Sequence, residues 1–134
     1  MATETRKRET QAETVSLRVA EALGKLRSRS SLEALLSLAS DPVPAVRGQA
    51  ALGLARRADS LGVDALVAAS ADTSADVRWK ATYALEKVVW PDRVLPAARA
   101  RLTDADPLAR LYAARTLGRQ KDRSAIRDVE DLLW

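Results

Sequence analysis

DTSADVRWKATYALE, residues 72–86, has two altered copies elsewhere in the chain. The upstream copy is DPVPAVRGQAALGLA at 41–55, and the downstream copy is DADPLARLYAARTLG at 104–118. The copies start 31 and then 32 residues apart, and each places an aspartate six residues before an arginine. Repeated units of this length indicate a solenoid, in which each unit packs mainly against its neighbours.

A weaker copy, VSLRVAEALGKL at 15–26, precedes these units. It has Leu23 at the position of the shared leucine, but Ser16 stands where the other copies have arginine. The alignment pairs Val15 with Val46, Val77 and Ala109 of the full copies, a position that we expect to be buried. The leucines that we predict to lie in the core of the full copies are Leu54, Leu85 and Leu117.

Apolar residues within each copy recur three and four positions apart, which is the spacing of one face of an α-helix. In residues 77–88 this face comprises Val77, Ala81, Ala84 and Leu85. A second apolar stripe follows the copies, although the span 91–102 fits it less well because Pro96 lies inside it. Each unit is therefore predicted to contain an inner helix followed by an outer helix. The predicted helices span 5–27, 30–40, 44–57, 60–71, 75–88, 91–102, 107–119 and 123–133.

The predicted fold class is therefore all-α, an α-solenoid of about four helical-hairpin repeats. We expect residues 1–134 to form a single domain of such repeats. Residues 1–10 are either disordered or an extension of the first helix.

The pattern D-x-x-x-x-V-R-x-x-A-x-x-A-L-G resembles a HEAT repeat, and it is most similar to the short bacterial type named after phycobilisome lyases. The resemblance covers residues 30–134 well and 11–29 in part. It implies that the aspartates and arginines form a ladder that ties each repeat to the next. Proteins with such repeats include scaffolds, regulators, lyase subunits and DNA-repair proteins, so the fold does not choose a function. The ladder residues are Asp41, Asp72, Asp104, Arg47, Arg78 and Arg110.

The composition excludes several kinds of chemistry. The chain has neither cysteine nor histidine, which removes disulfides, thiolate nucleophiles, Cys/His metal sites and histidine acid–base catalysis. We therefore predict no enzymatic activity, cofactor or metal site. The N-terminus lacks an apolar signal region and no segment has the length of a membrane span, so we expect a cytoplasmic protein without a membrane partner.

Two aromatic residues of the central copy do not lie on its buried stripe. Trp79 lies two residues from both Val77 and Ala81, which places it about 200° around the helix from each. Tyr83 lies one turn further along the same outward stripe. In a solenoid, the outward stripes of the inner helices form the concave binding surface. We expect Tyr83 to be displayed there, whereas packing over the next helix explains Trp79 equally well.

The alignment places further apolar and basic residues beside these rings. Aromatic anchors surrounded by cations are typical of an interaction hot spot. The predicted partner-binding residues are Trp79, Tyr83, Leu111 and Tyr112, with Leu52 at the margin and with Lys80, Lys87, Arg115 and Arg119 around them.

A row of cations also recurs at the ends of the inner helices, at Lys25, Arg56, Lys87 and Arg119. The favourable interaction of a cation with a helix C-terminus explains this row without a ligand. Alternatively, the row lines one edge of a groove that receives an acidic partner.

These observations favour a non-enzymatic scaffold or adaptor that binds a protein partner, through an apolar or acidic segment, on its concave face. A nucleic-acid-binding solenoid is one alternative. It is disfavoured because the net charge of +4 arises from 22 basic and 18 acidic residues that are interleaved along the chain. A second alternative is a non-catalytic subunit or accessory domain of an enzyme, such as a bilin lyase or a peptidyl-prolyl isomerase.

Overall fold

Seven helices and no strand occur in the described part of the chain. The computed structural model describes residues 2–26, 28–56, 59–88 and 90–120. The helices are α1 (Ala2–Lys25), α2 (Arg29–Leu38), α3 (Pro44–Leu54), α4 (Ser60–Ala69), α5 (Ala75–Glu86), α6 (Pro91–Arg101) and α7 (Pro107–Arg119). The all-α prediction is confirmed, and the helix predicted at 123–133 lies outside the described residues.

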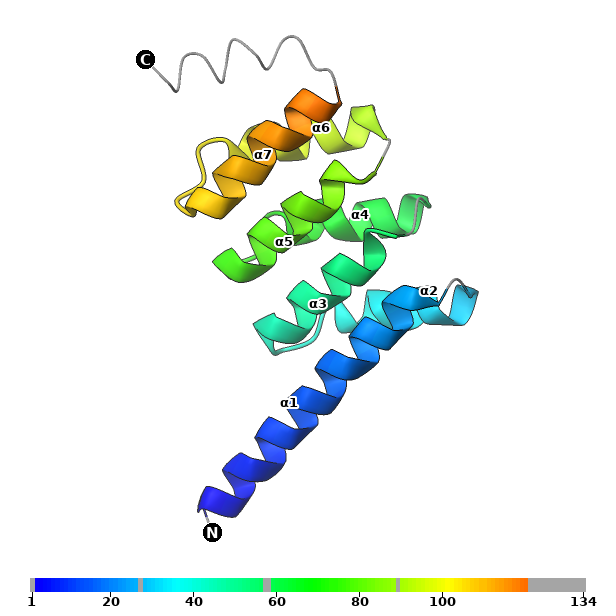
Figure 1. Cartoon of the computed structure of the whole chain (residues 1–134), viewed down its shortest axis with the longest axis vertical. Coiled ribbons are helices and arrows are strands. Elements are labelled where there is room, and N and C mark those ends of the chain that lie inside the picture. The colour runs from blue at the N-terminus through cyan, green and yellow to red at the C-terminus, as the bar shows by residue number, and fades with distance from the viewer. Residues whose placement is uncertain (1, 27, 57–58, 89, 121–134) are drawn as a thin grey trace.

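The helices form two layers that run along the length of the molecule (Figure 1). Helices α1, α3, α5 and α7 contact one another in that order and form the inner layer, while α2, α4 and α6 form the outer layer. Each outer helix packs against the two inner helices that flank it in the sequence. The architecture is the predicted solenoid of helical hairpins, and we call the surface presented by α1, α3, α5 and α7 the inner-helix face.

Local signals explain where the helices begin. Pro44 and Pro107 occupy the first turns of α3 and α7. Backbone N–H groups in a first turn have no intrahelical acceptor, so proline costs no helical hydrogen bond there. The Asp106 carboxylate caps α7 by accepting a hydrogen bond from the Ala109 N–H at 2.9 Å. Several helices end one to three residues before the predicted position, because the chain continues there as single turns, as in the bond from the Ser40 N–H to the Ser37 carbonyl.

The repeat alignment correctly identifies the core of α3, α5 and α7. Leu54, Leu85 and Leu117 are all buried, as predicted. The predicted face of α5, from Val77 to Leu85, is buried at each of its four positions. The main core cluster extends from α2 to α6, and a smaller one joins α6 to α7.

The alignment is wrong for the start of the first copy. Val15 and Val19 are 60% and 45% exposed, whereas Ala20 is fully buried. The reason is that α1 packs against α2 and α3, and no described helix covers its other side. Helix α1 begins at Ala2, and its first part projects beyond the stack (Figure 1).

The aspartates and arginines form the ladder that the resemblance implied. Arg47 Nε and Nη2 donate to the two carboxylate oxygens of Asp72 at 2.9 and 3.0 Å. Arg78 makes the same pair of bonds to Asp104 at 2.9 and 3.2 Å. Each arginine also holds the loop of its own repeat, as in the bond from Arg47 Nη1 to the Asp41 carbonyl at 2.9 Å. Arg47, Asp72, Arg78 and Asp104 therefore stabilise the stacking of repeats, as the resemblance implied. Among the described residues, Asp41 and Arg110 bond only within their own repeat.

The ladder also lowers the pKa of its aspartates. Burial by itself raises the pKa of Asp72, but the hydrogen bonds from Arg47 and from the Ser74 N–H outweigh it, so the pKa lies below its ordinary value. The pKa of Asp104 is lowered in the same way, against the effect of burial, with Arg78 as the main partner. Both side chains are therefore held in the charged form.

Two glycines allow α1 to approach α3 closely. A Cβ atom on Gly24 would lie 2.8 Å from the Cα of Gly53, and a Cβ on Gly53 would lie 2.9 Å from a methyl carbon of Leu35. The first of these clashes is with backbone, which a rotamer change cannot relieve. Any side chain at Gly24 would therefore push the two helices apart.

We expect Gly24→Ala to lower the free energy of unfolding by about 1–3 kcal/mol, the usual cost of overpacking a close contact. The better helix propensity of alanine offsets little of this cost, because Gly24 is the second-last residue of α1. Urea denaturation followed by circular dichroism measures the change. The matched control is Gly118→Ala in α7, where the new methyl group meets no atom within 4 Å. Equal midpoints for the two variants would contradict the close contact.

Candidate partner-binding surface

Three aromatic side chains gather on the inner-helix face where α5 meets α7. The rings of Trp79 and Tyr112 stack with their centroids 5.7 Å apart and their planes at 22°. The rings of Tyr83 and Tyr112 meet edge to face, with centroids 5.2 Å apart and planes at 74°. All three side chains are half-buried. We call these three residues the aromatic cluster.

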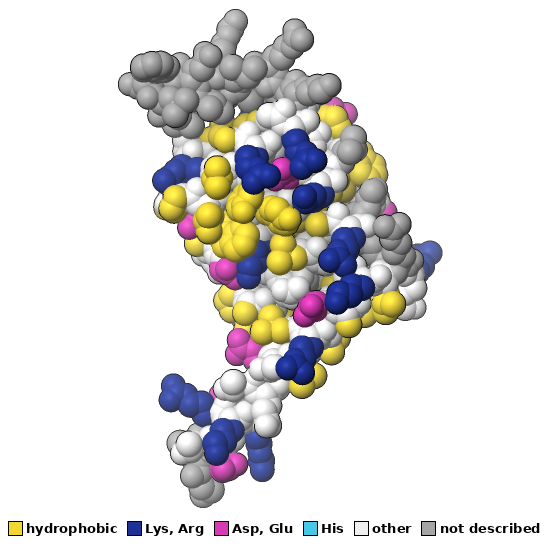
Figure 2. All heavy atoms as spheres, viewed as in Figure 1, with side chains coloured by type: hydrophobic (Ala, Val, Ile, Leu, Met, Phe, Trp, Pro, Cys, Tyr) yellow, Lys and Arg dark blue, Asp and Glu magenta, His cyan; other side chains and the backbone are white. Residues whose placement is uncertain are grey.

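The aromatic cluster is consistent with both explanations that the sequence left open for Trp79, packing between repeats and display to a partner. Trp79 stacks on a ring of the next inner helix, so it does pack between repeats. The cluster nevertheless keeps part of its surface open, and the half-exposed Leu111 of α7 also remains uncovered. Figure 2 shows apolar side chains gathered over α5 and α7 on this face. The predicted aromatic residues are thus brought together at one place.

Each ring of the cluster also has a cation near its face. Such contacts contribute about 0.5–1 kcal/mol each at exposed sites. The nitrogen or guanidinium carbon lies 5.6 Å from the ring centroid for Lys80 and Trp79, 5.2 Å for Lys87 and Tyr83, and 5.5 Å for Arg115 and Tyr112. The structure therefore places three of the predicted cations directly beside the rings.

These cations differ in whether a carboxylate neutralises them. Lys80 Nζ lies 2.9 Å from Asp76 Oδ2, and its aliphatic stem passes close to Gly48 of α3. Lys87 is exposed, and no described carboxylate lies within 4.0 Å of its ammonium group. Lys87 is therefore more available to a partner than Lys80, a distinction that the sequence did not reveal.

Glu86 is a buried carboxylate that the sequence analysis did not assign to the site. Its side chain is only 2% exposed, and its Oε1 accepts hydrogen bonds from Arg115 at 3.2 Å and from Arg119 at 3.1 Å. Its Oε2 has no hydrogen-bond partner among the described residues. The repeat pattern held no signal for it, because the aligned positions are Gly24, Ala55 and Gly118. Both predicted arginines are thus already engaged with this carboxylate.

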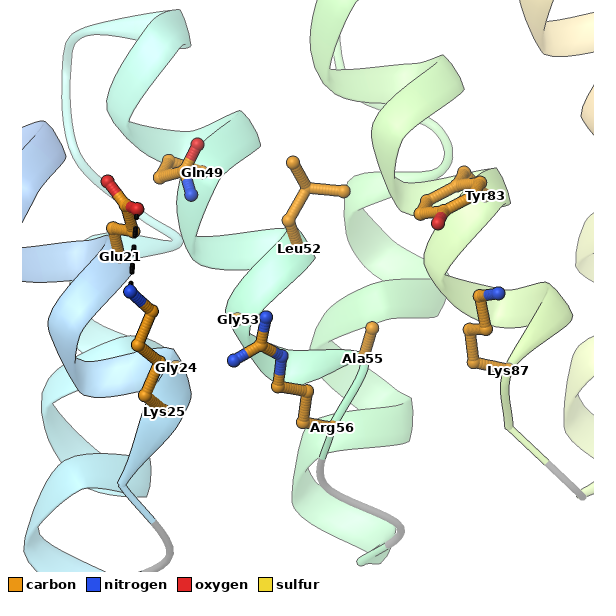
Figure 3. A pocket seen from close by; sticks show the side chains of 10 residues that line it. All are labelled: Glu21, Gly24, Lys25, Gln49, Leu52, Gly53, Ala55, Arg56, Tyr83 and Lys87. Carbon is orange, nitrogen blue, oxygen red and sulfur yellow. Dashed lines mark ion pairs between the residues drawn. The ribbon is translucent and has the colours of Figure 1, made fainter.

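A pocket of about 400 Å³ opens on the same face beside the aromatic cluster, between α1, α3 and α5. Figure 3 shows Lys25, Arg56 and Lys87, one from the end of each helix, in a row along one side. Leu52 and Tyr83 lie on the other side, so Tyr83 belongs to both the pocket and the aromatic cluster. The remaining lining residues are Glu21, Gly24, Gln49, Gly53 and Ala55.

The pocket carries an excess of positive charge. Lys25 Nζ lies 3.7 Å from Glu21 Oε1, and both side chains are well exposed. Arg56 and Lys87 have no carboxylate within 4.0 Å among the described residues. The sequence analysis recognised the cation row but missed the hollow, which Gly24 and Gly53 help to line.

A comparison with known families gives one match. A family model for HEAT repeats matches residues 7–86, which is more than half of the 134 residues. The chain belongs to the HEAT-repeat family. No curated protein matches it. The resemblance seen in the sequence is therefore confirmed at the level of the family, and HEAT repeats generally act as protein-interaction scaffolds.

In this HEAT-repeat protein, no helix within the described ranges is long and apolar enough to cross a bilayer. Among the same residues, no group of three or more acidic side chains is arranged to hold a metal ion. The inner-helix face offers aromatic rings, aliphatic surface and unneutralised cations, which are groups suited to recognition.

Proposed function

We propose that this HEAT-repeat protein is a non-enzymatic scaffold or adaptor of the short bacterial type that acts in the cytoplasm and binds a partner protein on its inner-helix face. The observation that carries this proposal is the half-exposed aromatic cluster, which adjoins a pocket on the same face. Tyrosine and tryptophan dominate interaction hot spots because they offer a large apolar area at a low cost in side-chain entropy.

Tyr83 is the centre of the proposed surface. One edge of the surface is the cluster with Trp79 and Tyr112, and the other is the pocket that Tyr83 lines together with Leu52. A partner that covers Tyr83 would therefore contact α3, α5 and α7 at once. Exposed apolar surface that spans several elements is typical of an interaction site.

The charge pairs around the aromatic cluster weigh against nucleic acid as the partner of that cluster. Binding to a phosphate backbone relies on cations that release counterions from the nucleic acid. Lys80 is neutralised by Asp76, and Arg115 and Arg119 share Glu86. Three of the four cations predicted around the cluster are therefore already paired, which favours a protein partner.

We expect Tyr83→Ala to weaken the binding of peptides selected on the wild-type chain by about 2 kcal/mol, the loss typical of a hot-spot residue. The selection uses a displayed library of random peptides, and titration of the selected peptides against both chains gives the affinities. The variant should lose about 1–2 kcal/mol of folding stability, because the edge-to-face contact with Tyr112 and the cation contact from Lys87 disappear.

The control is Leu61→Ala, which removes an exposed leucine from the outer helix α4 and should change neither quantity. Tyr83→Phe is a second control, because it keeps the ring contact with Tyr112. Selected peptides that bind Tyr83→Ala as tightly as the wild type would refute the proposed function, as would a library from which no peptide is enriched.

A further inference from the structure

The cations of the pocket recur at one position of three successive repeats. Lys25, Arg56 and Lys87 come from three successive inner helices and lie on one side of the pocket (Figure 3). Because neighbouring packed helices lie about 8–10 Å apart, the backbone positions from which these side chains project recur at about that interval. Figure 2 shows Lys and Arg side chains following this line from α7 towards α1.

Two of the three charges are unneutralised in the described structure. Arg56 and Lys87 have no described carboxylate within 4.0 Å, and Arg56 is exposed. Lys25 has only the exposed Glu21, at 3.7 Å, and such pairs on a helix surface contribute little. The row is therefore complementary to a ligand that carries several negative charges.

The interval between the inner helices selects the conformation of such a ligand. A polyproline II helix has three residues per turn and rises about 3.1 Å per residue, so side chains three residues apart share one face at a separation of roughly 9.3 Å. In a β-strand, side chains on one face are about 6.8 or 13.6 Å apart, and neither value matches the spacing of the inner helices.

We propose that the pocket binds an acidic segment of a partner protein in the polyproline II conformation. Carboxylates on every third residue of the segment pair with Lys25, Arg56 and Lys87. Apolar side chains between them contact Leu52 and Tyr83 on the opposite side of the pocket. This inference rests on the proposed function, and it specifies the chemistry of the partner segment.

The test uses two short proline-rich peptides of identical composition and the full chain. One peptide carries a glutamate at every third residue, and the other carries its three glutamates side by side. We expect the spaced peptide to bind about tenfold more tightly in a fluorescence-polarisation titration, because only it reaches all three cations at once. Equal affinities for the two peptides would overturn the proposal, since charge without spacing would then explain binding.

The matched variants are Arg56→Ala and Arg8→Ala. Arg56→Ala should lower the affinity for the spaced peptide about tenfold, which is the effect of losing one charge-assisted hydrogen bond in a partly enclosed site. Arg8→Ala removes the same charge from the projecting part of α1 and should leave the affinity unchanged. An unchanged affinity of Arg56→Ala, or an oligonucleotide that binds more tightly than the spaced peptide, would overturn the proposal.

A third peptide separates this inference from the proposed function. Its glutamates are replaced by glutamines, so it keeps the apolar residues and the polyproline II conformation. If it binds as tightly as the acidic peptide and still depends on Tyr83, the proposed function stands and the acidic partner is refuted. If none of the three peptides binds and the random library also yields no Tyr83-dependent peptide, both proposals fall.

Discussion

Replacing Leu85 by alanine is expected to lower the free energy of unfolding by about 2–5 kcal/mol, the usual range for a buried leucine. Leu85 is fully buried in α5 and belongs to the core cluster that extends from α2 to α6. The cavity lies in a central inner helix, which packs on neighbours at both sides, so the surrounding helices cannot collapse freely. Urea denaturation followed by circular dichroism measures the loss.

Leu61→Ala is the matched control for this prediction, because it makes the same chemical change at a side chain that is 58% exposed. Its unfolding free energy should stay within about 0.5 kcal/mol of the wild type. If Leu85→Ala also left the urea denaturation midpoint unchanged, the helical register that places this leucine in the core would be wrong.

The second large effect is expected from Asp104→Ala, which should lower the free energy of unfolding by about 3 kcal/mol. The Asp104 side chain is only 2% exposed, and its Oδ2 accepts bonds at 2.9 Å from both Arg78 Nε and Arg101 Nη1. Its Oδ1 accepts the Asp106 N–H, also at 2.9 Å. Breaking a buried ion pair costs about 3–5 kcal/mol, and the lower end applies because both arginines retain some contact with water.

The chain contains its own control at Asp41. This residue has the same place in its repeat and accepts the Val43 N–H at 2.9 Å. No described arginine of a preceding repeat bonds to its carboxylate, because Ser16 stands at the arginine position. Asp41→Ala should therefore lose only the stabilisation of the turn. The difference between the two losses of unfolding free energy then measures the contribution of the ion pairs. Equal losses would show that the ladder adds nothing beyond the turn.

The ladder also predicts how stability depends on pH. The pKa values of Asp72 and Asp104 are lower in the folded chain than the ordinary aspartate value of about 3.9. Their contribution is therefore fully present above that value and is lost as the pH falls through the lowered pKa values. Asp104→Ala should show a shallower decline of stability in this acidic range than the wild type, which denaturation at a series of pH values would measure.

The sequence predicted much of the fold because each repeat makes the same contacts as the next. The positions of Leu54, Leu85 and Leu117 could be assigned from the period, and all three are buried. The same argument failed at Val15 and Val19, which are exposed. An alignment assumes that every copy has a neighbour on both sides, and α1 has a described neighbour on one side only.

The candidate surface was predictable in part. The helical period placed Trp79 and Tyr83 away from the buried stripe, and both lie on the inner-helix face together with Tyr112. The period did not predict that Glu86 would be buried beneath two arginines, because no other copy has an acid there.

The sequence by itself therefore determined the helical repeats, their core leucines, the ladder and the side of the helix on which the aromatic residues lie. These features follow from local periodicity and from contacts that recur once per unit. The tertiary structure decided which cations are free and where the surface is hollow. Neutralisation of Arg115 depends on a carboxylate 29 residues away, and the pocket is lined by residues from three helices, α1, α3 and α5. Such features arise where particular side chains, or their absence, meet across helices, and no periodic pattern encodes them.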